Sequence, residues 1–67
     1  MRYNSPYEIG LGDVVIHEGR THLVLINYIK GETDAKGYTP KTNRTILIDD
    51  SDRKTVVNDY RTLEVVG

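Results

Sequence analysis

The sequence predicts an all-β domain over residues 1–67, in which five short strands form a small, strongly bent and partly open barrel. Val, Ile, Thr and Tyr are abundant, and clusters of Gly and Asp interrupt the apolar runs at short intervals, which is typical of strands joined by turns. No segment repeats apolar residues at a 3.6-residue period over three turns, so long helices are not expected. A bent barrel also limits the exposed strand edges.

The first expected elements are an N-terminal arm and a hairpin. The arm covers residues 1–8. Runs rich in Val, Ile and Leu at Gly12–Glu18 and Thr21–Ile29 predict two strands, the second of them longer. Glu18 and Gly19 between them are expected to form a two-residue turn, since Gly accepts the positive φ that such turns need.

The second half of the chain is expected to add three strands and one turn of helix. The strands cover Arg44–Asp49, Lys54–Asn58 and Leu63–Val66, and the helical turn falls in Asn58–Thr62. Residues 30–43 join the second and third strands and contain two Gly, one Pro, three Thr and no large aliphatic residue. A connection this long without its own element is uncommon in a small domain, so we expect a functional or a mobile loop.

Burial of aliphatic side chains of the strands is expected to supply the core. A chain this short buries only about 60 % of the surface that its unfolded form exposes, so its stability is expected to be marginal. The residues expected to contribute most are Val14, Ile16, Val24, Ile26, Ile46, Ile48, Val56, Leu63 and Val65.

Three stretches of the chain resemble the Src-homology-3-like (SH3-like) small barrels. "GDVVIHEGRTHLVLI" is similar to the opening hairpin of Tudor and KOW modules, "TILIDDSDRKTVV" to the third and fourth Tudor strands, and "VVNDYRTLEVV" to the Src-homology end with its Tyr on a single helical turn. The resemblance implies a five-stranded barrel that acts as a binding module. Asp50 stands where Tudor modules often have Tyr, and the chain has no Trp or Phe, so the resemblance concerns the fold and not the usual ligands.

Composition weighs against several classes of function. Nine Lys and Arg against ten Asp and Glu give a net charge of −1, whereas nucleic-acid binders usually have a basic excess. A local basic patch stays open. The chain has no Cys, no run of about 18 apolar residues and no secretory signal pattern, so we expect a cytoplasmic protein without membrane contact. Its size and the Met at its start suggest a complete small gene product, an accessory or regulatory factor of a phage or other mobile element.

The titratable residues do not form a recognisable catalytic or metal motif. Asp49, Asp50 and Asp52 lack the length and the final Glu of a calcium loop, and Asp is a common turn former, so we expect a turn. His17 and His22 have no third metal ligand in the sequence pattern, and we expect a solvated pair, with His17 opposite Arg20 across the hairpin. We therefore expect no enzymatic activity, no metal and no cofactor.

The long second strand has apolar residues on both faces. A period of two places Leu23 and Leu25 on the face opposite Val24, Ile26 and Tyr28. Two interpretations of the Leu23 and Leu25 face stay open. Either it contacts a partner or a second copy, or it is covered, because the strand bends or because the N-terminal residues Tyr3, Tyr7 and Ile9 lie over it.

The long loop combines basic residues with an aromatic one. Tyr38 lies among Lys30, Lys36, Lys41 and Arg44, a mixture that can bind single-stranded nucleic acid by phosphate contact and stacking. A solvated loop and a protein contact are the alternatives. We expect a protein-binding module, with nucleic-acid association or self-association as alternatives, and with the partner-binding residues Leu23, Leu25, Tyr28, Tyr38, Lys41, Arg44 and Tyr60.

Overall fold

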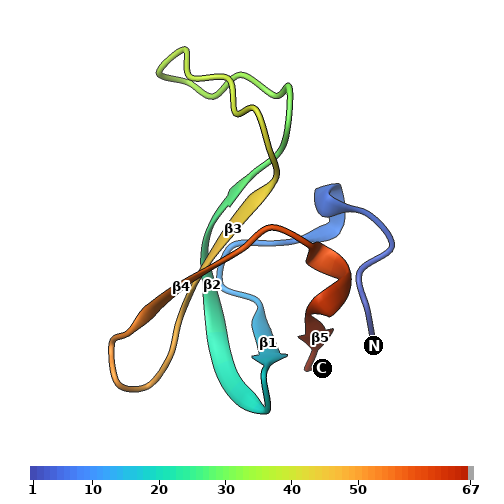
Figure 1. Ribbon diagram of the computed structural model, residues 1–67, viewed down its shortest axis with the longest axis vertical. Coiled ribbons are helices and arrows are strands. Elements are labelled where there is room, and N and C mark those ends of the chain that lie inside the picture. The colour runs from blue at the N-terminus through green and yellow to red at the C-terminus, as the bar shows by residue number, and fades with distance from the viewer. Residues whose placement is uncertain (67) are drawn as a thin grey trace.

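The computed structural model describes residues 1–66 and contains one five-stranded antiparallel sheet with the strand order β4-β3-β2-β1-β5 (Figure 1). The all-β class is confirmed, and every strand begins and ends within two residues of its predicted bounds. Within residues 1–66, β4 and β5 are the two edges of the sheet and do not pair with each other, so the sheet does not close into a barrel. The elements are η1 (Pro6–Glu8), β1 (Val14–His17), β2 (Arg20–Tyr28), β3 (Arg44–Ile48), β4 (Lys54–Val57), η2 (Tyr60–Thr62) and β5 (Glu64–Val65), where η marks a single 3-10 turn.

The hairpin between β1 and β2 has the predicted two-residue turn. His17 pairs with Arg20, and the residues between them, Glu18 and Gly19, have φ angles of 52° and 76°. Two consecutive positive φ angles define the type I′ turn, whose twist matches that of the flanking strands. The turn therefore sets the register of the first two strands.

A β-bulge at Leu25 changes which side of β2 faces inward. Val24 pairs with Leu47, but the next pair joins Ile26 to Ile46, so Leu25 is an extra residue on β2. Because side chains alternate along a strand, one extra residue reverses the alternation beyond it. The prediction that Ile26 shares a face with Val24 is therefore wrong, since Ile26 points to the same side as Leu23.

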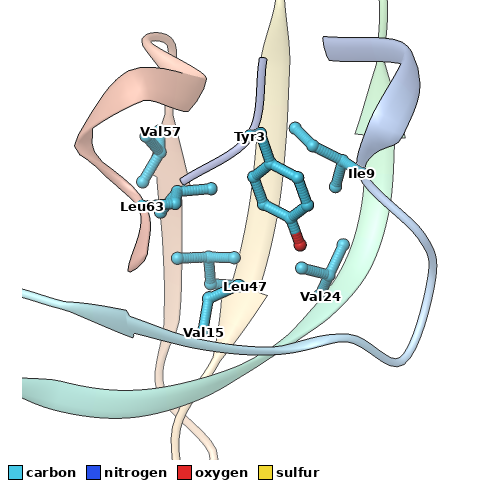
Figure 2. Close-up of a cluster of buried hydrophobic side chains, with 7 residues drawn as sticks. All are labelled: Tyr3, Ile9, Val15, Val24, Leu47, Val57 and Leu63. Atoms are coloured by element: carbon cyan, nitrogen blue, oxygen red, sulfur yellow. The ribbon is translucent and has the colours of Figure 1, made fainter. Parts of the chain in front are cut away.

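The hydrophobic core lies on one side of the sheet, under the N-terminal segment and η2. Figure 2 shows its seven side chains converging from four strands and from the two segments that cover them. Burial of Val24 and Leu63 confirms two of the nine predicted core residues, and Val65 packs against the cluster. The core consists of Tyr3, Ile9, Val15, Val24, Leu47, Val57 and Leu63.

Six of the predicted core residues point to the other side of the sheet, so their assignment to the core is wrong. Five of them alternate along β1, β3 and β4 with the buried Val15, Leu47 and Val57, and Ile26 follows the bulge in β2. The physical reason is that β1 and β3 are aliphatic on both faces, so alternation alone does not distinguish the inner face. The six are Val14, Ile16, Ile26, Ile46, Ile48 and Val56.

The N-terminal segment covers the core and not the Leu23 and Leu25 side. Tyr3 and Ile9 belong to the core, and Tyr7 is 66 % exposed. The interpretation that these three residues cover Leu23 and Leu25 is therefore wrong. The segment also protects an edge of the sheet, because the Val65 amide donates to the Met1 carbonyl at 2.6 Å and Arg2 forms an isolated bridge with Glu64.

The connection between β2 and β3 extends away from the sheet (Figure 1). We call this connection, residues 29–43, the arm from here on; it is distinct from the N-terminal segment. It is held by its own hydrogen bonds: the Gly31 amide donates to the Pro40 carbonyl at 3.0 Å, and the Asp34 amide to the Tyr38 carbonyl at 2.9 Å. The Asp34 carboxylate accepts from the amides of Lys36 and Tyr38, both at 2.9 Å. Among residues 1–66, no helix is long and apolar enough to cross a membrane.

Candidate interaction face

The outer face, the side of the sheet opposite the core, carries aliphatic side chains in adjoining cross-strand rows. The strand registers place Val14, Leu23 and Ile48 in one row, which ends at Lys54 on β4, and Ile26, Ile46 and Val56 in the next. Leu23, Ile26 and Val56 are 46, 40 and 54 % exposed. Monomeric soluble proteins rarely expose large contiguous apolar patches, and such patches mark interaction sites. The Tyr28–Arg44 pair lies beyond the two rows on the same outer face.

An aromatic and cationic cluster forms the end of the outer face nearest the arm. Arg44 pairs with Tyr28 across β2 and β3, and its guanidinium carbon lies 5.2 Å from the Tyr28 ring centre and 6.0 Å from that of Tyr38. An Arg44 guanidinium nitrogen also donates to the Tyr38 hydroxyl at 2.6 Å. The two rings meet edge to face at 5.7 Å. Arg44 thus supplies a cation–π partner from the chain itself and fixes Tyr38 beside the sheet.

The other end of the outer face is bounded by the turn between β3 and β4. Asp49 confirms the predicted turn, since its carboxylate accepts from the amides of Ser51 at 2.8 Å and Arg53 at 3.0 Å. The Arg53 hydrogen bond, with help from Ser51 and from the charges of Arg20 and Arg53, lowers the pKa of Asp49 below its usual range. Among residues 1–66, no three His, Asp or Glu side chains are placed to hold a metal ion.

An open hollow of about 420 Å³ lies where the outer face meets this turn. Leu23 and Ile48 supply its apolar wall, and Asp50 its acidic rim. The Arg20 guanidinium lies 3.8 Å from the Asp49 carboxylate and 3.9 Å from that of Asp50. The Asp50 carboxylate is 93 % exposed, so it can meet a cation from a partner in addition to Arg20. The hollow thus combines an apolar wall with an exposed ion pair.

The two histidines are not the solvated pair that the sequence predicts. The His22 residue is only 5 % exposed, and the His17 side chain is 17 % exposed. The rings meet edge to face at 5.9 Å, and His22 Nδ1 lies 2.9 Å from the Arg20 carbonyl oxygen. They bury because the alternation that places His22 on the core side also places it beside His17. Both histidines are therefore packed on the inner side of the sheet.

The structure brings together most of the residues predicted to bind a partner, but not all. Leu23, Tyr28 and Arg44 lie on the outer face, with Tyr38 held against Arg44, whereas Tyr60 packs against the core and donates to the Asn4 carbonyl at 3.4 Å. Lys41 is exposed in the arm, and Leu25 is 38 % exposed at the bulge.

The residues in the middle of the outer face were not among the predicted partner-binding residues. They are Ile26, Ile46, Ile48 and Val56, which we expected in the core. The run Ile46-Leu47-Ile48 carried a signal, because a strand with three consecutive large aliphatic residues must present at least one of them on each face.

Comparisons with protein-family models, curated proteins and solved structures found no match to this chain. The function of this protein must therefore be inferred from the geometry and chemistry of the outer face.

Proposed function

We propose that this protein is a non-catalytic binding module that binds a protein partner through the outer face. The observation that carries the proposal is the continuous apolar surface of Leu23, Ile26, Ile46, Ile48 and Val56. Three of these side chains, Leu23, Ile26 and Val56, are exposed, and Ile46 and Ile48 are half-buried. Removing apolar area from water is worth about 25 cal/mol per Å². A protein partner that covers these rows therefore gains binding free energy without a cofactor.

The Tyr28, Tyr38 and Arg44 cluster supports a protein ligand. Tyr and Arg are enriched among the few residues that dominate binding energy at protein interfaces. The cluster is already ordered, because Arg44 holds Tyr38 by a hydrogen bond and by a ring contact. An ordered side chain loses less conformational entropy on binding. The same geometry disfavours a methylated cation as ligand, since Arg44 already lies over both rings.

We also propose that the sheet is an open form of the SH3-like small barrels of the Tudor and KOW kind. Its support is the strand order, the tight β1–β2 turn, the bulge in β2 and the single 3-10 turn before β5. Such folds serve many unrelated functions, so the fold adds nothing to the choice of partner. A small module of this kind suits an accessory or regulatory factor.

The proposal is tested by affinity capture from the source cell with three forms of the protein. The wild type should retain one or more proteins at stoichiometric yield. Ile46→Lys, which places a charge in the middle of the outer face, should release them, because an unpaired charge in an apolar interface is unfavourable. Leu11→Lys is the matched control: Leu11 is 70 % exposed in the turn before β1. Equal retention by Ile46→Lys and the wild type would disprove the proposal.

Nucleic-acid association is a second candidate, favoured by the arm. Lys30, Lys36 and Lys41 are exposed around Tyr38, and an aromatic ring beside cations can bind a single strand. Retention on a single-stranded nucleic-acid column should then decrease steeply as salt increases. Absence of retention at about 50 mM salt, where phosphate contacts are strong, would exclude this candidate.

A further inference from the structure

We infer that the protein covering the outer face is a second copy of this chain, related by a two-fold axis that crosses the strands near Ile46. The inference depends on the proposed function, since it names the partner of the same face. Three features of the described residues support it: the balance of buried and exposed aliphatic residues, the distribution of charge along the face, and the match between its two ends.

The single chain leaves seven aliphatic side chains on the outer side of the sheet and buries six in its core, beside Tyr3. Of the seven, Val14, Ile16, Ile46 and Ile48 are half-buried, and Leu23, Ile26 and Val56 are exposed. Small domains with limited cores are commonly stabilised by oligomerisation. A standard interface uses about 800 Å² per partner, roughly a sixth of the 4666 Å² that one chain exposes.

The charge distribution selects the orientation of the second copy. The arm end of the face carries Lys30, Lys41 and Arg44, and its acidic Glu32 accepts a hydrogen bond from Tyr7 at 2.6 Å. A two-fold axis parallel to the strands would place these basic residues against their own copies. An axis across the strands instead places them over the opposite end, where three acids, Asp49, Asp50 and Asp52, balance three cations, Arg20, Arg53 and Lys54. The second arrangement avoids the repulsion, and its closest attraction is to the exposed Asp50 carboxylate.

The two ends also complement each other in shape and polarity. Rows of outward side chains are about 7 Å apart, two residues along a strand. An axis at the middle row, Ile26–Ile46–Val56, therefore places the Tyr28–Arg44 pair of one copy over the Leu23–Ile48 row of the other. That row borders the hollow, which offers an apolar wall to an aromatic ring and the Asp50 carboxylate to a guanidinium. In an isologous interface this contact occurs twice.

The mass of the protein in solution tests the inference. Sedimentation equilibrium of the wild type over a wide concentration range should show a dimer of twice the 7.6 kDa chain, and Tm should rise with protein concentration. Ile46→Lys and Leu23→Lys should be folded monomers by circular dichroism, with Tm independent of concentration. Leu11→Lys should remain dimeric. A dimer that survives both Lys substitutions would overturn the inference.

A charge exchange tests the orientation. Asp50→Lys and Lys30→Glu should each raise the dimer dissociation constant, by roughly tenfold, because each replaces two attractions with two repulsions. The double variant should return to nearly the wild-type constant. If the double variant is as weak as the sum of the two single changes, the axis across the strands is wrong.

The outcomes separate this inference from the proposed function. A wild type that is monomeric at about 1 mM overturns self-association, whatever it captures. If that monomer retains a different protein that Ile46→Lys releases, the proposed function still holds with a different partner. If it retains none, both fail.

Discussion

The buried face of the sheet contains polar residues, whereas the middle row of the solvent-exposed face contains none. The inner face buries Val15, Val24 and Leu47, but beside them it also buries His22 and Thr45. The middle of the outer face has only aliphatic residues in its Ile26–Ile46–Val56 row. In its middle row, this sheet is thus more uniformly apolar on the side that faces solvent.

The difference shows what determines burial in so small a chain. The inner face becomes the core because Tyr3, Ile9 and Leu63 are available to cover it, not because it is the more apolar face. Its polar residues are tolerated because they are paired: the Thr45 hydroxyl donates to Asn27 at 2.8 Å. On the outer face Leu23, Ile26 and Val56 stay exposed, which is why we propose it as the surface for association.

The strongest test of the comparison uses two neighbours on β3. Leu47 is fully buried, whereas Ile46 points outward. Leu and Ile have side chains of equal size, so changing each to Ala removes the same number of carbon atoms from the two faces. Leu47→Ala should lower the free energy of unfolding by about 2–5 kcal/mol, by lost transfer free energy and a residual cavity. Urea denaturation of Leu47→Ala in the monomeric Leu23→Lys background, followed by circular dichroism, measures this loss.

Ile46→Ala is the matched control, measured in the Leu23→Lys background so that association does not contribute. It should cost well under half of the Leu47→Ala value, since Ile46 is only half-buried. Equal losses for the two variants would show that the faces are assigned incorrectly.

The second test removes a polar pair from the inner face. The Asn27 side chain accepts from Thr45 and donates to the Pro6 carbonyl at 2.9 Å. Asn27→Ala should therefore cost roughly 1–3 kcal/mol in urea denaturation, because buried polar groups lose their partners. Thr45→Val should recover part of that loss when added to Asn27→Ala, since it removes one unpaired hydroxyl. A double variant less stable than the sum of the two single losses would contradict the pairing.

Much of the fold could be predicted because its signals are local. The Glu18-Gly19 turn needs only two residues with positive φ, and the Asp49 turn needs only a side chain within reach of nearby amides. Both were predicted correctly, as were the strands that they join. Such features depend on residues a few positions apart.

The inner and outer faces could not be predicted because the deciding facts are not local. The bulge at Leu25 reverses the alternation of β2, and nothing in the run from Leu23 to Ile26 marks the extra residue. Which side of β3 is buried depends on Tyr3, more than forty positions earlier in the chain. Leu23 was correctly predicted to lie on the surface, because it precedes the bulge. Ile26 lies just beyond the bulge and was therefore assigned to the wrong face.

The third test concerns Tyr3, which covers the inner face and donates to Asp13 at 2.7 Å. Burial, and then the hydrogen bond with the Asp13 carboxylate, raise the pKa of Tyr3 above its usual range. A tyrosine with a raised folded-state pKa stabilises the fold fully below its unfolded pKa of about 10, and this contribution is lost as pH rises through the folded value. Urea denaturation between pH 8 and 11 should show decreasing stability above about pH 10.

Tyr3→Phe is the control for that decrease. It should cost about 1 kcal/mol at neutral pH, since Gly10 still donates to Asp13 at 2.9 Å. It should also lose less stability than the wild type at alkaline pH. An identical alkaline decrease in both proteins would assign it to other groups.

The smallest expected effect compares the two acids that follow β3. The Asp49 side chain is 6 % exposed and accepts two amide hydrogen bonds, whereas Asp50 is 93 % exposed. Asn keeps an acceptor oxygen for the amides but removes the charge that faces Arg20 and Arg53. Asp49→Asn should therefore lower Tm at pH 7 by less than Asn27→Ala does, and Asp50→Asn should leave Tm of the Leu23→Lys monomer unchanged.

The pH dependence decides whether the charge of Asp49 is responsible. A carboxyl with a lowered folded-state pKa stabilises the fold above its unfolded pKa of about 3.9, and this contribution is lost as pH falls through the folded value. The Tm difference between the wild type and Asp49→Asn should thus be present at pH 6 and disappear toward pH 2. A difference that persists at pH 2 would mean that the hydrogen-bond geometry of the turn, and not its charge, separates Asp49 from Asp50, its solvent-exposed neighbour beside the outer face.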